Sequence, residues 1–276
     1  MGEIDPDSLE QAFGEDPDAT LATLADMTSA TDRRLADLAR RLAGRLAVDL
    51  VRVGGAAPRR AVGRLATRRW RDAGGDLDLD ASLEPIAEAR ATRAALDPHD
   101  LRVRTWVRPT LAIALCVDRS GSMGGAPLAA SALAAAAVTL RAPQDASVMA
   151  FGAEVVVVQS QDVPRPVESV VRDVLALRGH GTTDVAGALR TAAAQLRRST
   201  ATRKVTVLMS DCRATVPGDV EGAARDLDEL LILAPATDDA EARQLAGAVG
   251  ARLVTLDPEA PSTVPERLAL LFDPAG

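Results

Sequence analysis

Three residues with oxygen-bearing side chains occur at alternate positions directly after an apolar stretch of the chain. They are Asp118, Ser120 and Ser122, and the apolar stretch covers residues 111–117. In a tight turn, side chains at alternate positions can place three oxygens around one point. Carboxylate and hydroxyl oxygens are hard ligands, which suit Mg²⁺, Ca²⁺ or Mn²⁺ rather than Zn²⁺. The spacing therefore indicates a hard-cation site at the end of a strand.

Other chemistries that use a turn of this kind fail on single positions. An aspartyl nucleophile of the haloacid dehalogenase type needs a second Asp where this chain has Ser120. A nucleophile elbow around Ser122 needs Gly at that same position. The Gly-x-Gly-x-x-Gly loop of dinucleotide-binding proteins is absent, and Lys204, the only lysine, is not part of a phosphate loop. The chain is therefore not expected to bind ATP through such a loop.

Two later segments place further oxygen ligands in a matching context. Thr183 lies in a Gly-rich loop before a predicted helix, and Asp211 ends an apolar stretch. The order Asp118-x-Ser120-x-Ser122, Thr183 and Asp211 resembles the metal-ion-dependent adhesion site of the von Willebrand factor A (VWA) family. If Asp118 and the two serines only capped the following helix, the threonine and the second aspartate would have no role.

The resemblance covers about residues 101–273 and implies a role for each ligand. In the family the two serines, and in some members the threonine, contact the metal directly, whereas the two aspartates act mostly through water. The ion, expected to be Mg²⁺ with Mn²⁺ or Ca²⁺ as alternatives, then keeps an open position for an Asp or Glu of a partner. The family usually has Gly where this chain has Cys212, which bears on the geometry of the partner contact. Asp184 is expected to cap the following helix.

The elements that must hold these residues follow from an alternation of strand and helix patterns after residue 100. The alternation predicts an α/β fold with a doubly wound, mostly parallel sheet of the Rossmann-like VWA type, whose sites lie at the carboxyl ends of strands. The first two strands are expected to form a hairpin. Strands are predicted at residues 101–107, 111–117, 146–151, 154–159, 203–210, 229–234 and 251–256. Helices are predicted at residues 126–141, 165–177, 184–198, 219–228, 238–249 and 263–272.

Residues 1–100 are expected to form a small helical domain ahead of a VWA domain at residues 101–276. Leucines at three- and four-residue spacing, and Asp-Pro pairs that suit the first turn of a helix, carry this prediction. Helices are predicted to start at Asp5-Pro6 and at Asp16-Pro17, and further helices at about residues 29–53, 58–71 and 82–95.

Charge is divided unevenly within this N-terminal region. Residues 1–32 carry nine acidic residues and no basic one, whereas residues 33–71 carry twelve arginines and two aspartates. Either the acidic segment lies along the basic one, or both are solvated faces, or the basic stretch docks on an acidic partner or a phosphate backbone. The formal net charge of −7 and the aromatic content of 2% argue against nucleic acid.

The layout, with a domain ahead of a carboxy-terminal VWA domain, resembles that of bacterial intracellular proteins such as the D-subunit of magnesium chelatase and the VWA proteins that work beside MoxR-type AAA+ ATPases. The resemblance implies a metal-dependent adaptor, not an enzyme, which binds an acidic residue of a partner and couples such an ATPase to a client protein. An RNA-associated protein using residues 33–71 is an alternative. A metal-dependent hydrolase is another, although no general base is evident beyond the ligands. The acidic N-terminus and the absence of a membrane-length apolar run predict a cytoplasmic protein without a membrane partner.

Overall fold

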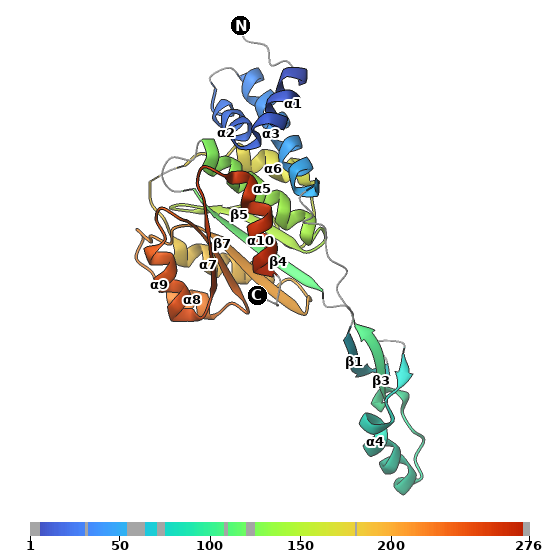
Figure 1. Cartoon of the computed structure of the whole chain (residues 1–276). Helices are drawn as coiled ribbons and strands as arrows, with labels where there is room; N and C mark the ends of the chain where they lie inside the picture. Colours follow the sequence, from blue (N-terminus) through green and yellow to red (C-terminus); the bar gives the residue numbers. More distant parts are fainter. Residues whose placement is uncertain are drawn as a thin grey trace. The chain divides into compact units, whose positions relative to one another are not determined.

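The computed structural model describes residues 6–30, 33–53, 64–70, 75–107, 110–119, 125–179 and 181–272. The chain forms two compact units (Figure 1): one combines Met1–Pro58 with Leu111–Gly276, and the other is Arg59–Thr110. This division differs from the single boundary expected near residue 100. The N-terminal helices belong with the large sheet, and the smaller unit is an insertion in the sequence between them and the first strand of that sheet.

Six strands form the central sheet of the larger unit, in the order β6-β5-β4-β7-β8-β9. Neighbouring strands are parallel except for β5 and β6, which are antiparallel. The doubly wound, mostly parallel sheet predicted from the sequence is confirmed, and its strands form where the apolar runs predicted them. Their bounds are β4 Leu111–Asp118, β5 Ala146–Phe151, β6 Val155–Gln159, β7 Arg203–Met209, β8 Leu230–Pro235 and β9 Arg252–Leu256.

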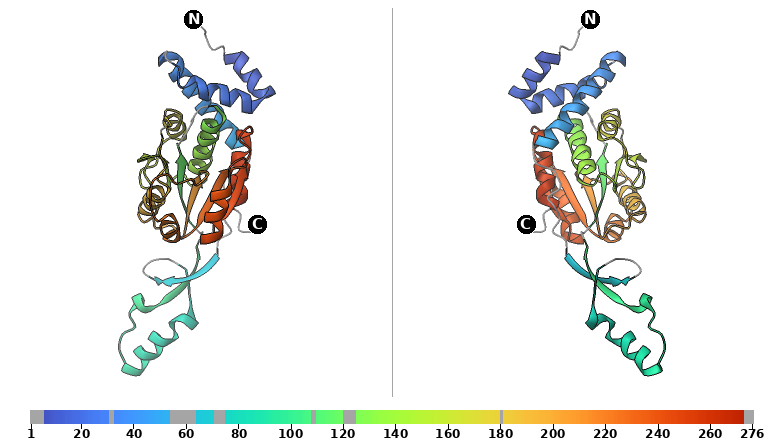
Figure 2. Two further views of the ribbon diagram at one scale, coloured as in Figure 1. Left: turned by 90° about the vertical axis from the view of Figure 1, so that its left-hand side faces the viewer. Right: turned by 90° about the vertical axis from the view of Figure 1, so that its right-hand side faces the viewer.

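Helices cover both faces of this sheet, as Figure 2 shows. Ile113 of β4 faces one apolar core and Ala112 faces the other, and the alternation continues to Val117, so the strand is apolar throughout. The first core contains residues of α5 (Gly125–Arg141), α6 (Val167–Leu175) and α10 (Val264–Phe272). The second contains residues of α7 (Val185–Leu196), α8 (Val220–Arg225) and α9 (Ala240–Val249).

Three N-terminal helices pack into the same core as α5 and α6: α1 (Pro6–Glu15), α2 (Pro17–Met27) and α3 (Arg33–Val53). Asp16 accepts a hydrogen bond from the backbone N–H of Ala19 at 2.9 Å, and Pro17 occupies the first helical position. The helix start predicted at Asp16-Pro17 is therefore confirmed. Buried Leu24 and Ala39 show that α2 and α3 contribute to the core of the larger unit.

Several arginines of the basic stretch lie beside acidic side chains. Arg45 is 3.9 Å from Glu10, and Arg52 is 3.6 Å from Glu168 of α6. Exposed pairs of this kind add little stability, but they offset charge. They favour the interpretation in which acidic and basic faces lie along each other, and they disfavour the one in which the basic stretch binds a phosphate backbone.

The smaller unit is a three-stranded antiparallel sheet with one α-helix. The order is β1-β3-β2, from β1 (Arg64–Arg69), β2 (Asp76–Leu77) and β3 (Arg102–Val107), and α4 (Leu79–Thr92) follows β2. The helix predicted at residues 58–71 is wrong over its described part, because β1 pairs with β3 along its whole length. The predicted hairpin is also wrong, because β3 pairs with β1 and β2 while β4 belongs to the central sheet.

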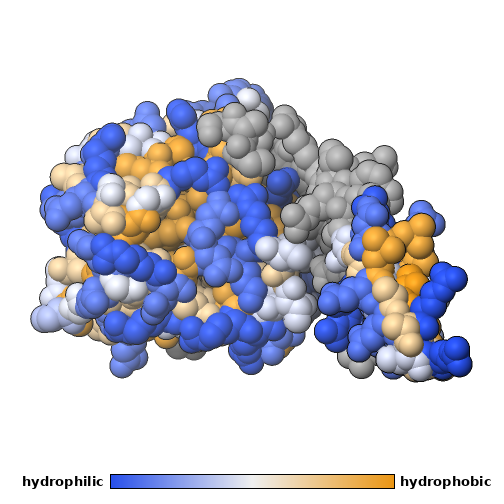
Figure 3. Space-filling model, turned by 90° about the horizontal axis from the view of Figure 1, so that it is seen from below, coloured by the Kyte–Doolittle hydropathy of each residue, from blue (hydrophilic) through white to orange (hydrophobic). Residues whose placement is uncertain are grey.

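The surface of the smaller unit mixes apolar and charged side chains (Figure 3). Leu79 and Leu83 of α4 are 62% and 59% exposed, and Leu77 of β2 is also exposed. Among the residues that the structure describes, no helix is both long and apolar enough to cross a membrane.

Candidate metal centre

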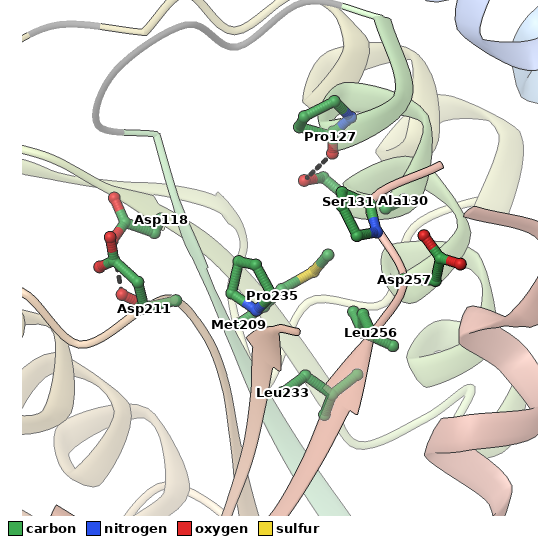
Figure 4. Close-up of a pocket in the computed structure, with 12 residues that line it drawn as sticks. Asp118, Pro127, Ala130, Ser131, Met209, Asp211, Leu233, Pro235, Leu256 and Asp257 are labelled. Carbon is green, nitrogen blue, oxygen red and sulfur yellow. Dashed lines mark hydrogen bonds between the residues drawn. The ribbon is translucent and has the colours of Figure 1, made fainter. Parts of the chain in front are cut away.

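Asp118 and Asp211 leave neighbouring parallel strands at the same edge of the central sheet. The last paired residues of β4 and β7 are Val117 and Met209, so each aspartate lies at or just beyond the end of its strand. The chain order of the sheet reverses between these two strands, and ligands of doubly wound sheets bind at such a point. Both side chains line one cavity of about 230 Å³, where Figure 4 shows them next to each other.

Ser210 joins the two strand ends. Its hydroxyl donates a hydrogen bond to Oδ2 of Asp118 at 2.5 Å and accepts one from the backbone N–H of Cys212 at 2.9 Å. The set of ligands predicted from the sequence does not include this residue. Its signal is a hydroxyl side chain between the apolar run that ends at Met209 and the acidic residue that follows.

Thr183 is 2% exposed and is held by the loop that follows Asp211. Its backbone N–H donates to Oγ1 of Thr215 at 2.7 Å, and its carbonyl accepts from the N–H of Thr215 at 3.0 Å. The next residue, Asp184, donates its N–H to the carbonyl of Gly152, just beyond β5, at 2.9 Å. The loop is therefore attached to the ends of both β5 and β7. The carboxylate of Asp184 accepts from an N–H in the first turn of α7, which confirms the predicted helix cap.

The structure places three of the five predicted ligands at this edge: Asp118, Thr183 and Asp211. Ser120 and Ser122 lie outside the described residues. Within the described part of the chain, no group of three or more His, Cys, Asp or Glu could hold a metal ion. That finding does not bear on the predicted donor set of two carboxylates and three hydroxyls, because hydroxyl side chains fall outside those residue types.

The pKa of the Cys212 thiol responds to the acidic side chains at this edge of the sheet. Burial raises the pKa of its thiol to about 12, and the charges of Asp211, Asp118 and Glu241 raise it in the same direction. Both predicted carboxylate ligands therefore act on one buried group. The backbone of Cys212 has φ of 65°, a left-handed conformation that Gly adopts without strain, which gives a physical reason for the Gly that the VWA family usually has here.

The rest of the cavity is mostly apolar. Figure 4 shows Asp257 on the wall opposite Asp118 and Asp211. The carboxylate of Asp257 accepts a hydrogen bond from the N–H of Glu259 at 3.0 Å, within its own turn. The apolar lining comes from α5, β7, β8 and β9 and the residue that follows Asp257: Pro127, Ala130, Met209, Leu233, Pro235, Leu256 and Pro258.

The family model described as "VWA domain containing CoxE-like protein" matches residues 24–263. The chain belongs to this family. The match begins within α2, so the family region includes α3, the smaller unit and the central sheet. No curated protein matches the sequence significantly.

Solved structures resemble this CoxE-like chain in fold. The von Willebrand factor type A structure from Catenulispora acidiphila is 18% identical over 60% of this chain and 43% of that chain, with a TM-score of 0.47. Proximal thread matrix protein 1 from the mussel byssus is 13% identical over 60% of this chain and 48% of that chain, with a TM-score of 0.47. The conserved hypothetical protein BatB from Bacteroides thetaiotaomicron is 12% identical over 58% of this chain and 97% of that chain, with a TM-score of 0.43. This chain thus spans less than half the length of the first two structures.

Proposed function

We propose that this CoxE-like protein is an adaptor whose VWA site holds a divalent cation and, through it, an acidic residue of a partner protein. The observation that carries the proposal is the convergence of Asp118 and Asp211 on one cavity, at the point where the chain order of the sheet reverses. Ser210 ties Asp118 to the β7 end, and the Thr183 loop is attached to the same edge.

The side chains at this edge fit a hard cation. Two carboxylates line one cavity, so a positive ion there would be attracted to both. The residues that would hold it are Asp118, Ser120, Ser122, Thr183 and Asp211, all oxygen donors of the kind that Mg²⁺ prefers, with Mn²⁺ or Ca²⁺ as alternatives. When bound, the ion would supply a positive charge with a coordination position open to a carboxylate.

The type of partner is inferred from the family. VWA domains and CoxE-like proteins are generally non-enzymatic adaptors that mediate protein–protein interactions. The resemblance to VWA proteins that work beside MoxR-type AAA+ ATPases extends this to an adaptor between such an ATPase and a client protein. The carboxylate that enters the site would then belong to one of these two proteins.

Metal titration of the full chain tests the first half of the proposal. Isothermal titration with Mn²⁺ and with Mg²⁺ should show binding to the wild type and none to Asp118→Ala or Asp211→Ala. Asp257→Asn is the matched control, because it removes one charge from the opposite wall of the same cavity. Unchanged titration of Asp118→Ala would overturn the assignment.

Partner capture tests the second half. The immobilised chain should retain an AAA+ ATPase from a native lysate in Mg²⁺ and release it in EDTA. The Asp211→Ala variant should retain none, and Asp257→Asn should behave as the wild type. Equal capture of the ATPase by wild type and Asp211→Ala would show that the contact does not run through this site.

A further inference from the structure

The C-terminal end of α2 contacts the start of α5, directly after the segment that contains two predicted metal ligands. Oδ1 of Asp26 accepts a hydrogen bond from the backbone N–H of Gly125 at 2.5 Å. Gly125 begins α5 with φ of 50°, and a Cβ at that position would lie 3.4 Å from the Asp26 carboxylate. A Cβ would make only ordinary contact there, so it is the left-handed backbone that favours Gly at this position. Asp26 thus holds the residue at which α5 begins.

The same end of α2 also contacts the second loop of the site. The carbonyl of Thr28, which is fully buried, accepts a hydrogen bond from Nη2 of Arg178 at 2.9 Å and another from Arg40 of α3 at 3.0 Å. Arg178 begins the loop that leads to Thr183, and its own carbonyl accepts from Nη1 of Arg119 at 3.4 Å. The end of α2 is therefore hydrogen-bonded to the first residue of α5 and to Arg178, which precedes Thr183 in the chain.

We propose that residues 26–28 are a positioning element of the metal centre, through which the N-terminal helices set its metal affinity. This inference rests on the proposed function. Asp26 binds the residue at which α5 begins, and Thr28 binds Arg178 at the start of the loop that leads to Thr183, so both contacts border segments that carry predicted ligands. Groups that orient metal ligands typically change metal affinity by roughly 10- to 100-fold when they are removed.

The other end of α2 provides a control of the same kind. The carboxylate of Asp18 accepts hydrogen bonds from the N–H of Ser262 at 2.6 Å and from its hydroxyl at 2.9 Å. Ser262 belongs to a short 3₁₀ turn before α10 and not to either ligand loop. Asp18→Ala therefore loosens the same helix without freeing those loops, and it should change stability but not metal affinity.

The experiment is a titration of the full-length variants with Mn²⁺ alone, with folding checked by circular dichroism. We expect Asp26→Ala to weaken Mn²⁺ binding roughly tenfold or more. Asp26→Asn should stay within about threefold of the wild type, because its amide oxygen still accepts from Gly125. Arg178→Ala, which frees the second loop, should weaken binding, and it remains informative if Asp26→Ala does not fold.

Three results distinguish the inference from the proposed function. If Asp118→Ala abolishes binding but Asp26→Ala and Arg178→Ala match Asp18→Ala, the metal site stands and the positioning role is wrong. If Asp26→Asn loses as much affinity as Asp26→Ala, the charge of Asp26 acts on the ion itself and the positioning role is again wrong. If Asp118→Ala binds like the wild type, the proposed function fails.

Discussion

Replacing Ser210 with Ala tests how the ends of β4 and β7 are joined. The change removes the hydrogen bond to Asp118 at 2.5 Å and leaves the backbone N–H of Cys212 without its acceptor. A hydrogen bond to a charged group contributes about 1.5–3 kcal/mol, and a buried N–H without a partner costs about 1–3 kcal/mol. Because these effects overlap in one side chain, we expect the free energy of unfolding to fall by about 2–4 kcal/mol.

Ser147→Ala is the matched control for this loss. Ser147 is fully buried in β5, and its hydroxyl has no hydrogen-bond partner in the described part of the chain. Its removal leaves no other polar group without a hydrogen-bond partner. The free energy of unfolding of the variant should therefore lie within about 0.5 kcal/mol of the wild-type value or above it. Urea denaturation followed by circular dichroism, in EDTA so that bound metal adds no stability, measures both variants. Equal stability of Ser210→Ala and Ser147→Ala would refute the reasoning.

Two further predictions concern the backbone at Cys212 and the ion pairs of Glu229. Residue 212 has a left-handed backbone, in which Gly avoids about 1–2 kcal/mol of strain that Ala would carry. Gly also makes the unfolded chain more flexible, which lowers the free energy of unfolding by about 0.4–1 kcal/mol. Urea denaturation should therefore show Cys212→Gly to be about 0.5–1 kcal/mol more stable than Cys212→Ala. Burial raises the pKa of Glu229, but hydrogen bonds and charges from Arg203 and Arg252 outweigh it and hold the pKa below its usual value. These ion pairs stabilise the fold fully above the pKa that Glu229 has in the unfolded chain, and the stabilisation is lost as pH falls through the lower pKa of Glu229 in the folded chain. The difference between the urea midpoints of wild type and Glu229→Gln should therefore become smaller in acid.

The strands and helices of the central sheet were predictable because each is long and strongly patterned. The segment at residues 111–117 is a continuous apolar run, which is what a strand in a sheet covered on both faces requires. The segment at residues 64–69 carries no comparable signal. Its strand exists because β3, more than thirty residues later, supplies hydrogen-bond partners along its whole length. Tertiary pairing thus overrode the local helix preference there.

The candidate site likewise contains some residues that could be identified from the sequence and some contacts that could not. Asp118 and Asp211 were identified from residue type and from their places after apolar strands, because the ends of adjacent parallel strands must meet at one edge. Ser210 could be noticed at a strand end, but its partner could not be named. Its bond to Asp118 spans 92 positions in the chain.

Local patterns and residue types at fixed spacing were enough to predict the α/β sheet, the order of the proposed ligands and the family. Packing between distant segments is what brings the N-terminal helices into the core of the VWA unit and makes residues 59–110 a unit of their own. It also decided that Asp26 meets Gly125, 99 positions away. No local pattern encodes such a contact, because it arises only when α2 packs against α5 and brings a helix end to the edge of the site.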